Sequence, residues 1–152
     1  MRRAVTADAG EIARLVSAAY SPWVPLVGYQ PKPMRVDYSE AVGHHRFDLL
    51  DASGEIIGLV ETDIEDDCLV VVNLAIAPQW QHRGLGRALL AHAETIARDS
   101  GYDRIRLYTN AVKSSNIALY RAVGYGIDGE QAVNGGTIVH LSKPLPTSAS
   151  LG

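Results

Sequence analysis

Hydrophobic and polar residues alternate along the chain with two different periods. Apolar residues recur three or four positions apart over residues 7–20 and 84–99, as on the inner face of an amphipathic helix. Shorter helices are expected near residues 37–42 and 115–123. Alternating or continuous apolar stretches predict strands over residues 2–5, 46–51, 55–64, 68–77, 104–109, 127–132 and 137–142. Strands interleaved with helices in this order indicate a mixed α/β sheet.

The segments between these elements add three expectations. Residues 68–77 form a nearly continuous apolar run, which implies a strand buried on both faces in the middle of the sheet. Residues 21–34 combine four prolines with large apolar side chains, so we expect an ordered loop there. A turn over residues 134–136 should join the last two strands. Residues 1–146 are expected to form a single domain, with residues 147–152 as a flexible tail.

Composition and charge narrow the class of protein. A chain of 152 residues with 47% hydrophobic and 20% charged residues is typical of a soluble globular domain. No apolar run reaches the roughly 20 residues that span a bilayer, and the N-terminus lacks a secretory h-region, so a cytoplasmic protein without membrane contact is expected. The net charge of -3 gives no reason to expect nucleic-acid binding. His44 and His45 have no third ligand in a metal-site pattern, so no metal is expected.

Residues 81–90, QHRGLGRALL, place two glycines at the start of a predicted helix. A dinucleotide fingerprint would need a glycine where Leu89 stands, and a P-loop would need Lys followed by Ser or Thr where Arg87 and Ala88 stand. What remains is a short glycine turn whose backbone N–H groups could bind a phosphate at the helix N-terminus. The alternative is a strand-to-helix turn that is rich in glycine without binding a ligand.

A wider set of residues resembles a known family. Residues 74–78, LAIAP, precede the glycine turn, and residues 116–120, NIALY, precede Gly124 and Tyr125. Together with Gln81-x-x-Gly84-x-Gly86 they resemble the GNAT superfamily of acetyl-CoA-dependent N-acetyltransferases, over about residues 55–145. The resemblance implies an α/β (α+β mixed) GNAT fold: a mostly antiparallel sheet of six to seven strands, splayed in the middle and flanked by about four helices. It also implies a bulge at Asn73–Leu74 that opens the sheet for the cofactor.

The resemblance implies acetyl transfer from acetyl-CoA to a primary amine by direct attack in a ternary complex. The alternative is a CoA-binding sensor or interaction module without efficient catalysis. Tyr120 would protonate the departing thiolate, and the amide of Leu74 would donate to the thioester carbonyl oxygen. The residues implied to bind the cofactor are Leu74, Ala75, Ile76, Gln81, His82, Arg83, Gly84, Leu85, Gly86, Arg87, Asn116 and Tyr120. Lys113 and Asn116 depart from the family pattern, since many members have asparagine and alanine there.

The acceptor side is less well defined by the sequence. Glu61, Asp63 and Glu65 share one face of a predicted strand, and Glu61 is the leading candidate for the base because it lies nearest the middle of that strand. This acidic cluster in the cleft would favour a cationic acceptor. Solvated surface carboxylates are the alternative. Residues expected to shape the substrate groove, or else to pack over the sheet edge, are Trp23, Tyr29, Met34, Tyr38 and Tyr108. The amine acceptor, a small molecule or a peptide, and a possible homodimer are left open.

Overall fold

The computed structural model describes residues 1–133 and 135–146. Position 134 of the expected turn and the expected tail at 147–152 lie outside the described residues. A seven-stranded sheet has the order β1-β2-β3-β4-β5-β7-β6. The strands are β1 (Arg2–Arg3), β2 (Arg46–Ala52), β3 (Glu55–Glu65), β4 (Cys68–Ile76), β5 (Arg104–Asn110), β6 (Gly126–Val133) and β7 (Gly136–Pro144). Only β4 and β5 pair in parallel among these strands, so the predicted mostly antiparallel mixed sheet is confirmed.

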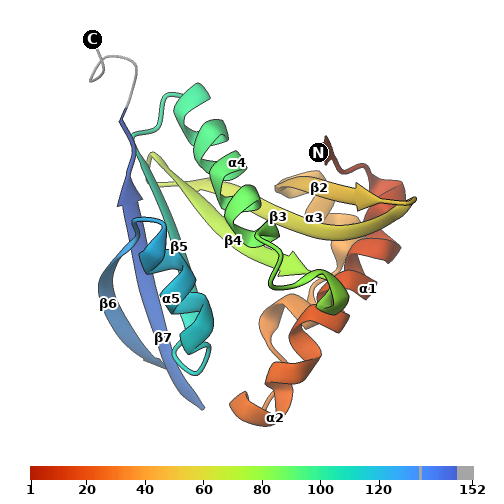
Figure 1. Cartoon of the computed structure of the whole chain (residues 1–152), viewed down its shortest axis with the longest axis horizontal. Helices are drawn as coiled ribbons and strands as arrows, with labels where there is room; N and C mark the ends of the chain where they lie inside the picture. The colour runs from red at the N-terminus through yellow and green to blue at the C-terminus, as the bar shows by residue number, and fades with distance from the viewer. Residues whose placement is uncertain (134, 147–152) are drawn as a thin grey trace.

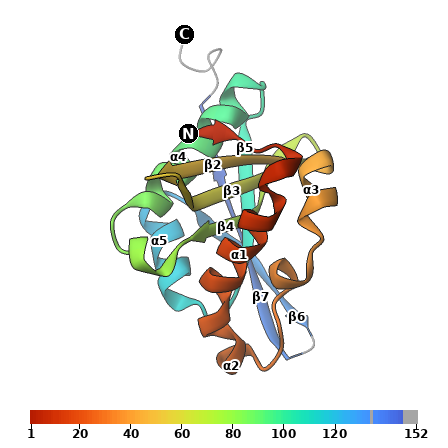
Figure 2. The same ribbon diagram turned by 90° about the vertical axis from the view of Figure 1, so that its right-hand side faces the viewer.

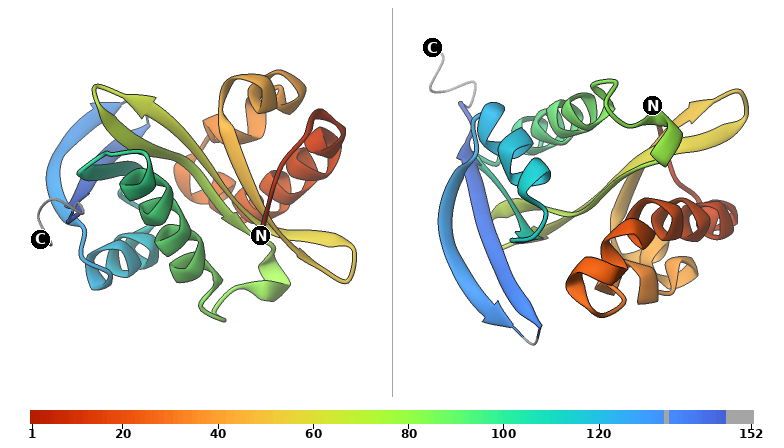
Figure 3. Two further views of the ribbon diagram at one scale, coloured as in Figure 1. Left: turned by 90° about the horizontal axis from the view of Figure 1, so that it is seen from above. Right: turned by 60° about the horizontal axis from the view of Figure 1, so that its bottom comes forward.

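Helices cover both faces of the sheet. They are α1 (Ala9–Tyr20), α2 (Val24–Val27), α3 (Tyr38–His44), α4 (Leu85–Asp99) and α5 (Ser114–Ala122). Helices α4 and α5 lie over one face, and α1 to α3 lie over the other (Figure 3). The first part of the loop predicted over residues 21–34 is helical, because residues 21–23 form a 3-10 turn that leads into α2. No helix in the part of the chain that the structure describes is both long and apolar enough to cross a bilayer.

Two hydrophobic cores lie on opposite sides of the central strands. Val60 packs into the core under α4, whereas its neighbour Leu59 packs into the core under α1, and both side chains are fully buried. Successive residues of a strand point to opposite faces, so a strand buried on both faces serves two cores at once. The apolar run of β4 was predicted to be buried in this way, and that prediction is confirmed.

A β-bulge interrupts β4 at Val72. Glu61 of β3 pairs with Asn73, but the next residue, Thr62, pairs with Val71, which leaves Val72 as the extra residue. The expected bulge at Asn73–Leu74 is therefore wrong by one position. Asn73 keeps its place in the ladder because its side-chain amide is anchored by two tyrosine hydroxyls. Because of the extra residue, the side chains that follow it point to the opposite face from the one that regular alternation would give. Asn73 therefore points toward the α1 side of the sheet.

The sheet opens beyond this bulge. Strands β4 and β5 are paired only from Leu69 to Val71, opposite Ile105 to Leu107, although both strands continue further. Figure 1 shows the two halves of the sheet diverging below this short paired region, with α4 crossing in front. The predicted splay between the central strand and the next one is confirmed.

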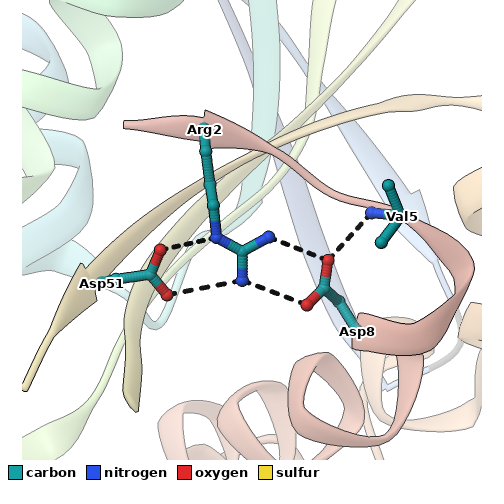
Figure 4. A network of polar contacts seen from close by, with 4 residues as sticks. All are labelled: Arg2, Val5, Asp8 and Asp51. Atoms are coloured by element: carbon teal, nitrogen blue, oxygen red, sulfur yellow. Dashed lines mark hydrogen bonds and ion pairs between the residues drawn. The ribbon is translucent and has the colours of Figure 1, made fainter. Parts of the chain in front are cut away.

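A polar cluster at the sheet edge fixes the start of α1. The Arg2 guanidinium donates to Asp51 at 2.6 Å and to both carboxylate oxygens of Asp8 at 3.0 Å (Figure 4). Asp8 also accepts the Val5 N–H at 2.8 Å, and the Arg2 hydrogen bond lowers the pKa of Asp8. These partly exposed pairs contribute on the order of 1 kcal/mol, but they join β1, β2 and the N-terminus of α1. Helix α1 in turn carries Tyr20 to the opening in the sheet.

Candidate active site

A cavity of about 730 Å³ fills the opening between the diverging strands. Its walls come from both halves of the molecule: from the segment that follows α1, from β3 and β4, from the glycine turn at the start of α4, and from β5 and the start of α5. Figure 2 shows α1 and α2 on the near side of the sheet, with α5 behind β4. Segments far apart in the sequence thus meet around one cavity.

The glycine turn forms one end of this cavity. Gly84 precedes α4 with φ of 83°, and His82 also has a positive φ, of 63°. The side chain of Gln81 fixes the turn by donating to the carbonyl of Ile76 at 3.1 Å. No side chain among the described residues caps the first N–H groups of α4, which leaves these donors for a ligand.

The space in front of the turn fits a bulky anion. A Cβ placed on Gly84 would have no neighbour within 4 Å, and a Cβ on Gly86 would be 3.4 Å from Leu119. Missing side chains at these positions allow a phosphate to approach the backbone, and a helix N-terminus attracts negative charge. The turn is therefore open to a phosphate group, the ligand that the sequence analysis considered for it.

Helix α5 contributes Tyr120 and Asn116, which both line the cavity from one helical face. Tyr120 is only 7% exposed, and burial raises its pKa to about 12. A phenol in this state keeps its proton at neutral pH. It can therefore donate a hydrogen bond or a proton to a group that develops negative charge in the cavity.

Glu61 lies on the opposite wall and is only 4% exposed. Burial raises the pKa of Glu61, while a hydrogen bond from His45 opposes this shift. The Nδ1 of His45 is 2.6 Å from the Glu61 carboxylate, and its Nε2 is 3.4 Å from that of Asp63. A buried carboxylate with a raised pKa beside a histidine is suited to accept a proton near neutral pH. His45 also lines a second, smaller cavity on the other side of β3.

A chain of hydrogen bonds holds the wall between these groups. Tyr20 donates to the Asn73 oxygen at 2.8 Å, Asn73 donates to the Tyr38 hydroxyl at 3.3 Å, and Tyr38 donates to the Pro33 carbonyl at 2.6 Å. Sequence reasoning missed Tyr20, Asn73 and His45. One signal was available, since Asn73 is the only polar residue in the apolar run 69–77.

Lys113 reaches the cavity from the residue before α5. It is only 8% exposed, and its ammonium lies 4.1 Å from the centroid of the Tyr20 ring and 5.4 Å from that of Trp23. Burial lowers the pKa of Lys113 to about 8. This side chain links the α5 half of the molecule to the segment that follows α1.

Most of the predicted groove residues lie where they were expected. Trp23, Tyr29, Tyr38 and Tyr108 line the cavity. Met34 lies outside the lining, although Lys32, Pro33 and Arg35 of the same 3-10 turn belong to it. A 3-10 helix has about three residues per turn, so a neighbour of lining residues can face away.

Arg83 is the one predicted cofactor-binding residue outside the lining of this cavity. Its guanidinium lies 4.8 Å from the centroid of the Trp80 ring instead. The other predicted cofactor-binding residues all contribute to the lining: Leu74, Ala75, Ile76, Gln81, His82, Gly84, Leu85, Gly86, Arg87, Asn116 and Tyr120.

The expected acidic cleft is wrong. Asp63 and Glu65 lie outside the lining because they follow Glu61 toward the exposed end of the hairpin, where Glu65 pairs with Arg106 at 3.4 Å. Among the described lining residues, Glu61 is the only carboxylate, whereas four carry cationic side chains: Lys32, Arg35, Arg87 and Lys113. The cavity therefore carries more positive than negative charge.

The splayed sheet and the glycine turn define an α/β protein of the acetyltransferase class. A family model described as the acetyltransferase (GNAT) family matches residues 11–125, which is well over half of the chain. The chain therefore belongs to the acetyltransferase (GNAT) family. The GNAT resemblance of the sequence and the predicted GNAT fold are confirmed.

Individual relatives agree with this assignment. The chain is 32% identical over 76 residues to the [ribosomal protein bS18]-alanine N-acetyltransferase of Escherichia coli strain K12, in a match that covers 50% of this chain and 51% of the relative. The chain thus spans about half the length of this curated relative. The crystal structure of the E. coli ribosomal-protein-S18-alanine N-acetyltransferase superposes with a TM-score of 0.76 at 20% identity, covering 93% of this chain and 90% of that one. The structure of PaiA N-acetyltransferase from Thermoplasma acidophilum in complex with coenzyme A superposes with a TM-score of 0.77 at 18% identity. The match covers 95% of this chain and 99% of that one.

Proposed function

We propose that the protein is an acetyl-CoA-dependent N-acetyltransferase that acts on a primary amine in a ternary complex. The observation that carries this proposal is that one cavity contains an uncapped glycine turn, a buried phenol and a buried carboxylate. Family membership supports the choice of acetyl-CoA, and so does the coenzyme A bound to the T. acidophilum PaiA structure. We also expect the protein to act in the cytoplasm.

The donor would bind along β4 and the glycine turn. The amides of residues 82–87 would hold the pyrophosphate, and the backbone of Leu74 and Ile76 would bond the pantetheine arm. Bound acetyl-CoA supplies an activated acyl thioester. The Leu74 amide would donate to the thioester carbonyl oxygen, where negative charge develops during attack. Because these donors belong to the backbone, they are held in place before the substrates bind.

The acceptor amine would lose its proton on the opposite wall. An alkylammonium has a pKa near 10, so a base must accept its proton before the nitrogen can attack. Glu61 would take this proton, directly or through a water molecule. His45 joins Glu61 to Asp63 and lines the second cavity, so it offers the proton a route away from the site. Tyr120 would protonate the departing thiolate.

Calorimetry with acetyl-CoA and with NAD tests the donor, and the release of free CoA thiol with a panel of amines tests the transfer. We expect binding of acetyl-CoA but not of NAD, and thiol release that depends on the amine. In the Tyr120→Phe variant, turnover should fall about 10- to 100-fold while the affinity for acetyl-CoA changes little. An unchanged rate would remove Tyr120 from its role as the acid. Tight binding of acetyl-CoA with no amine-dependent thiol release would instead indicate a CoA-binding sensor.

A further inference from the structure

Lys113 carries a buried positive charge without a negative partner. The residue is only 8% exposed, and no ion pair of the described residues includes its ammonium, which lines the cavity. Its partners are the faces of the Tyr20 and Trp23 rings, at 4.1 and 5.4 Å. Buried charges in proteins are normally paired, because an isolated charge loses its hydration without compensation. Ring faces compensate for only part of this loss.

The position of this ammonium relates it to the acceptor rather than to the donor. Tyr20 and Trp23 lie at the end of α1 and in the turn that follows it, a different part of the cavity lining from the glycine turn before α4. The pyrophosphate would be held at that turn, by the N–H groups at the start of α4. Lys113 is therefore available to a second anionic group in the same cavity.

The surrounding charges favour an anion in this region. Lys32 and Arg35 line the cavity from the turn that precedes α3, and Glu61, the only lining carboxylate in the described chain, is already bonded to His45. A polycationic acceptor would meet these positive side chains unfavourably. An acceptor with one amine and one carboxylate would match both walls, with the amine at Glu61 and the carboxylate at Lys113.

We propose that the acceptor is an amine that carries a carboxylate, such as an amino acid, and that Lys113 binds this carboxylate. This inference rests on the proposed N-acetyltransferase function and adds the class of acceptor. Because the carboxylate would replace the missing counter-charge of Lys113, binding of such an acceptor would stabilise the charged form of the lysine. Lys113 is thus a specificity-determining residue.

The test compares each amino acid with its own carboxamide at saturating acetyl-CoA, with spermidine as a polycationic reference. Thiol release should give a kcat/KM at least 10-fold higher for the acid than for the carboxamide in the preferred pair. The amine of a carboxamide is the weaker base and is neutral more often, so amine protonation cannot produce this preference. The Lys113→Met variant should reduce the acid-to-carboxamide ratio at least 5-fold, mainly through KM for the acid, whereas Lys113→Arg should retain part of it.

The matched control is Arg121→Met, which removes an exposed cation from α5, the helix that Lys113 precedes, outside the cavity. This variant should keep the wild-type ratio. The inference would be overturned if the enzyme used acids and carboxamides equally, or if it preferred spermidine. It would also be overturned if Lys113→Met left the acid-to-carboxamide ratio of kcat/KM unchanged, or if acetyl-CoA bound but no amine that carries a carboxylate was turned over. Failure to bind acetyl-CoA at all would instead overturn the proposed function, so the two failures are distinguishable.

Discussion

The donor end of the cavity is built from consecutive residues, 81–87, whereas the acceptor end takes Tyr20, Glu61 and Lys113 from three distant segments. At the donor end, backbone groups provide the binding surface, and the sequence shows them through glycine spacing. At the acceptor end, side chains provide it, and only the folded sheet brings them together. The comparison teaches that the proposed phosphate site is a local feature of the sequence, while the proposed acceptor site depends on the tertiary structure.

The largest effect is expected at the acceptor end, from removal of the base. The Glu61→Gln variant keeps the shape of the side chain but cannot take a proton from the amine, so kcat should fall about 100- to 1,000-fold. The affinity for acetyl-CoA should remain, since Glu61 lies on the other wall. Steady-state kinetics with calorimetry measure both quantities. Glu65→Gln, on the same strand but outside the cavity, is the control, and an equal loss in both variants would contradict the role of Glu61.

The next effect is expected at the donor end. In Gly84→Val a side chain enters the open space before the turn and a β-branched residue is forced to positive φ, so the Kd for acetyl-CoA should rise about 30- to 100-fold. Gly101→Val is a closely matched control. Gly101 has φ of 85° and also no neighbour within 4 Å of an added Cβ, but it follows α4 at its other end. Similar losses of affinity in both variants would mean that backbone strain is responsible, rather than a blocked phosphate site at the glycine turn.

A smaller effect is expected from removal of His45, the partner of Glu61. The pKa of Glu61 is raised by burial, and the hydrogen bond from His45 holds it down. His45→Gln weakens this support, so the pKa of Glu61 should rise further and the acidic limb of the pH–rate profile should move to higher pH. We expect the variant to be slower than the wild type at acidic pH and to recover as the pH rises. His44→Gln, at the adjacent exposed position, should leave the pH profile unchanged; a shift in both variants would contradict the pairing.

The smallest effect concerns stability rather than rate. The pKa of Lys113 falls from 10.5 to about 8 in the folded protein, so the unfolded chain binds more protons between these pH values. The charge thus destabilises the wild type below pH 8, and this cost disappears as the pH rises toward 10.5. Lys113→Met should therefore be more stable by about 1 kcal/mol at pH 7, with an advantage that shrinks above pH 8. Urea unfolding at several pH values measures this difference, and Arg121→Met should show no such trend.

The contrast between the two ends also explains how far the sequence could be interpreted. The strands, the main helices and the glycine turn follow from local periodicity and spacing, and the structure confirms them. Glu61 was chosen because it lies nearest the middle of the predicted strand, but strand spacing puts Asp63 and Glu65 on the same face. The bulge at Val72 and the fold of the hairpin decide which carboxylate is buried. The single domain over residues 1–146 and the catalytic roles of Tyr120, Glu61 and Leu74 stay predictions.

The position of Lys113 in the cavity could not be predicted from the sequence either. In the sequence it is only a departure from the family pattern, and its rings come from residues about 90 positions earlier. The positive balance of the cavity could not be predicted either, because it depends on which charged residues face inward. The acidic residues Asp63 and Glu65, which were expected in the cleft, thus lie at the more exposed end of the hairpin.

Amide hydrogen exchange with and without acetyl-CoA tests the central claim most directly, because it locates the donor on the backbone itself. We predict slower exchange at residues 82–87 and at Leu74 and Ile76, with no change at Gly101. The Gly84→Val variant should lose this protection at the same concentration of acetyl-CoA. Slower exchange confined to other segments, with residues 82–87 unaffected, would contradict the account.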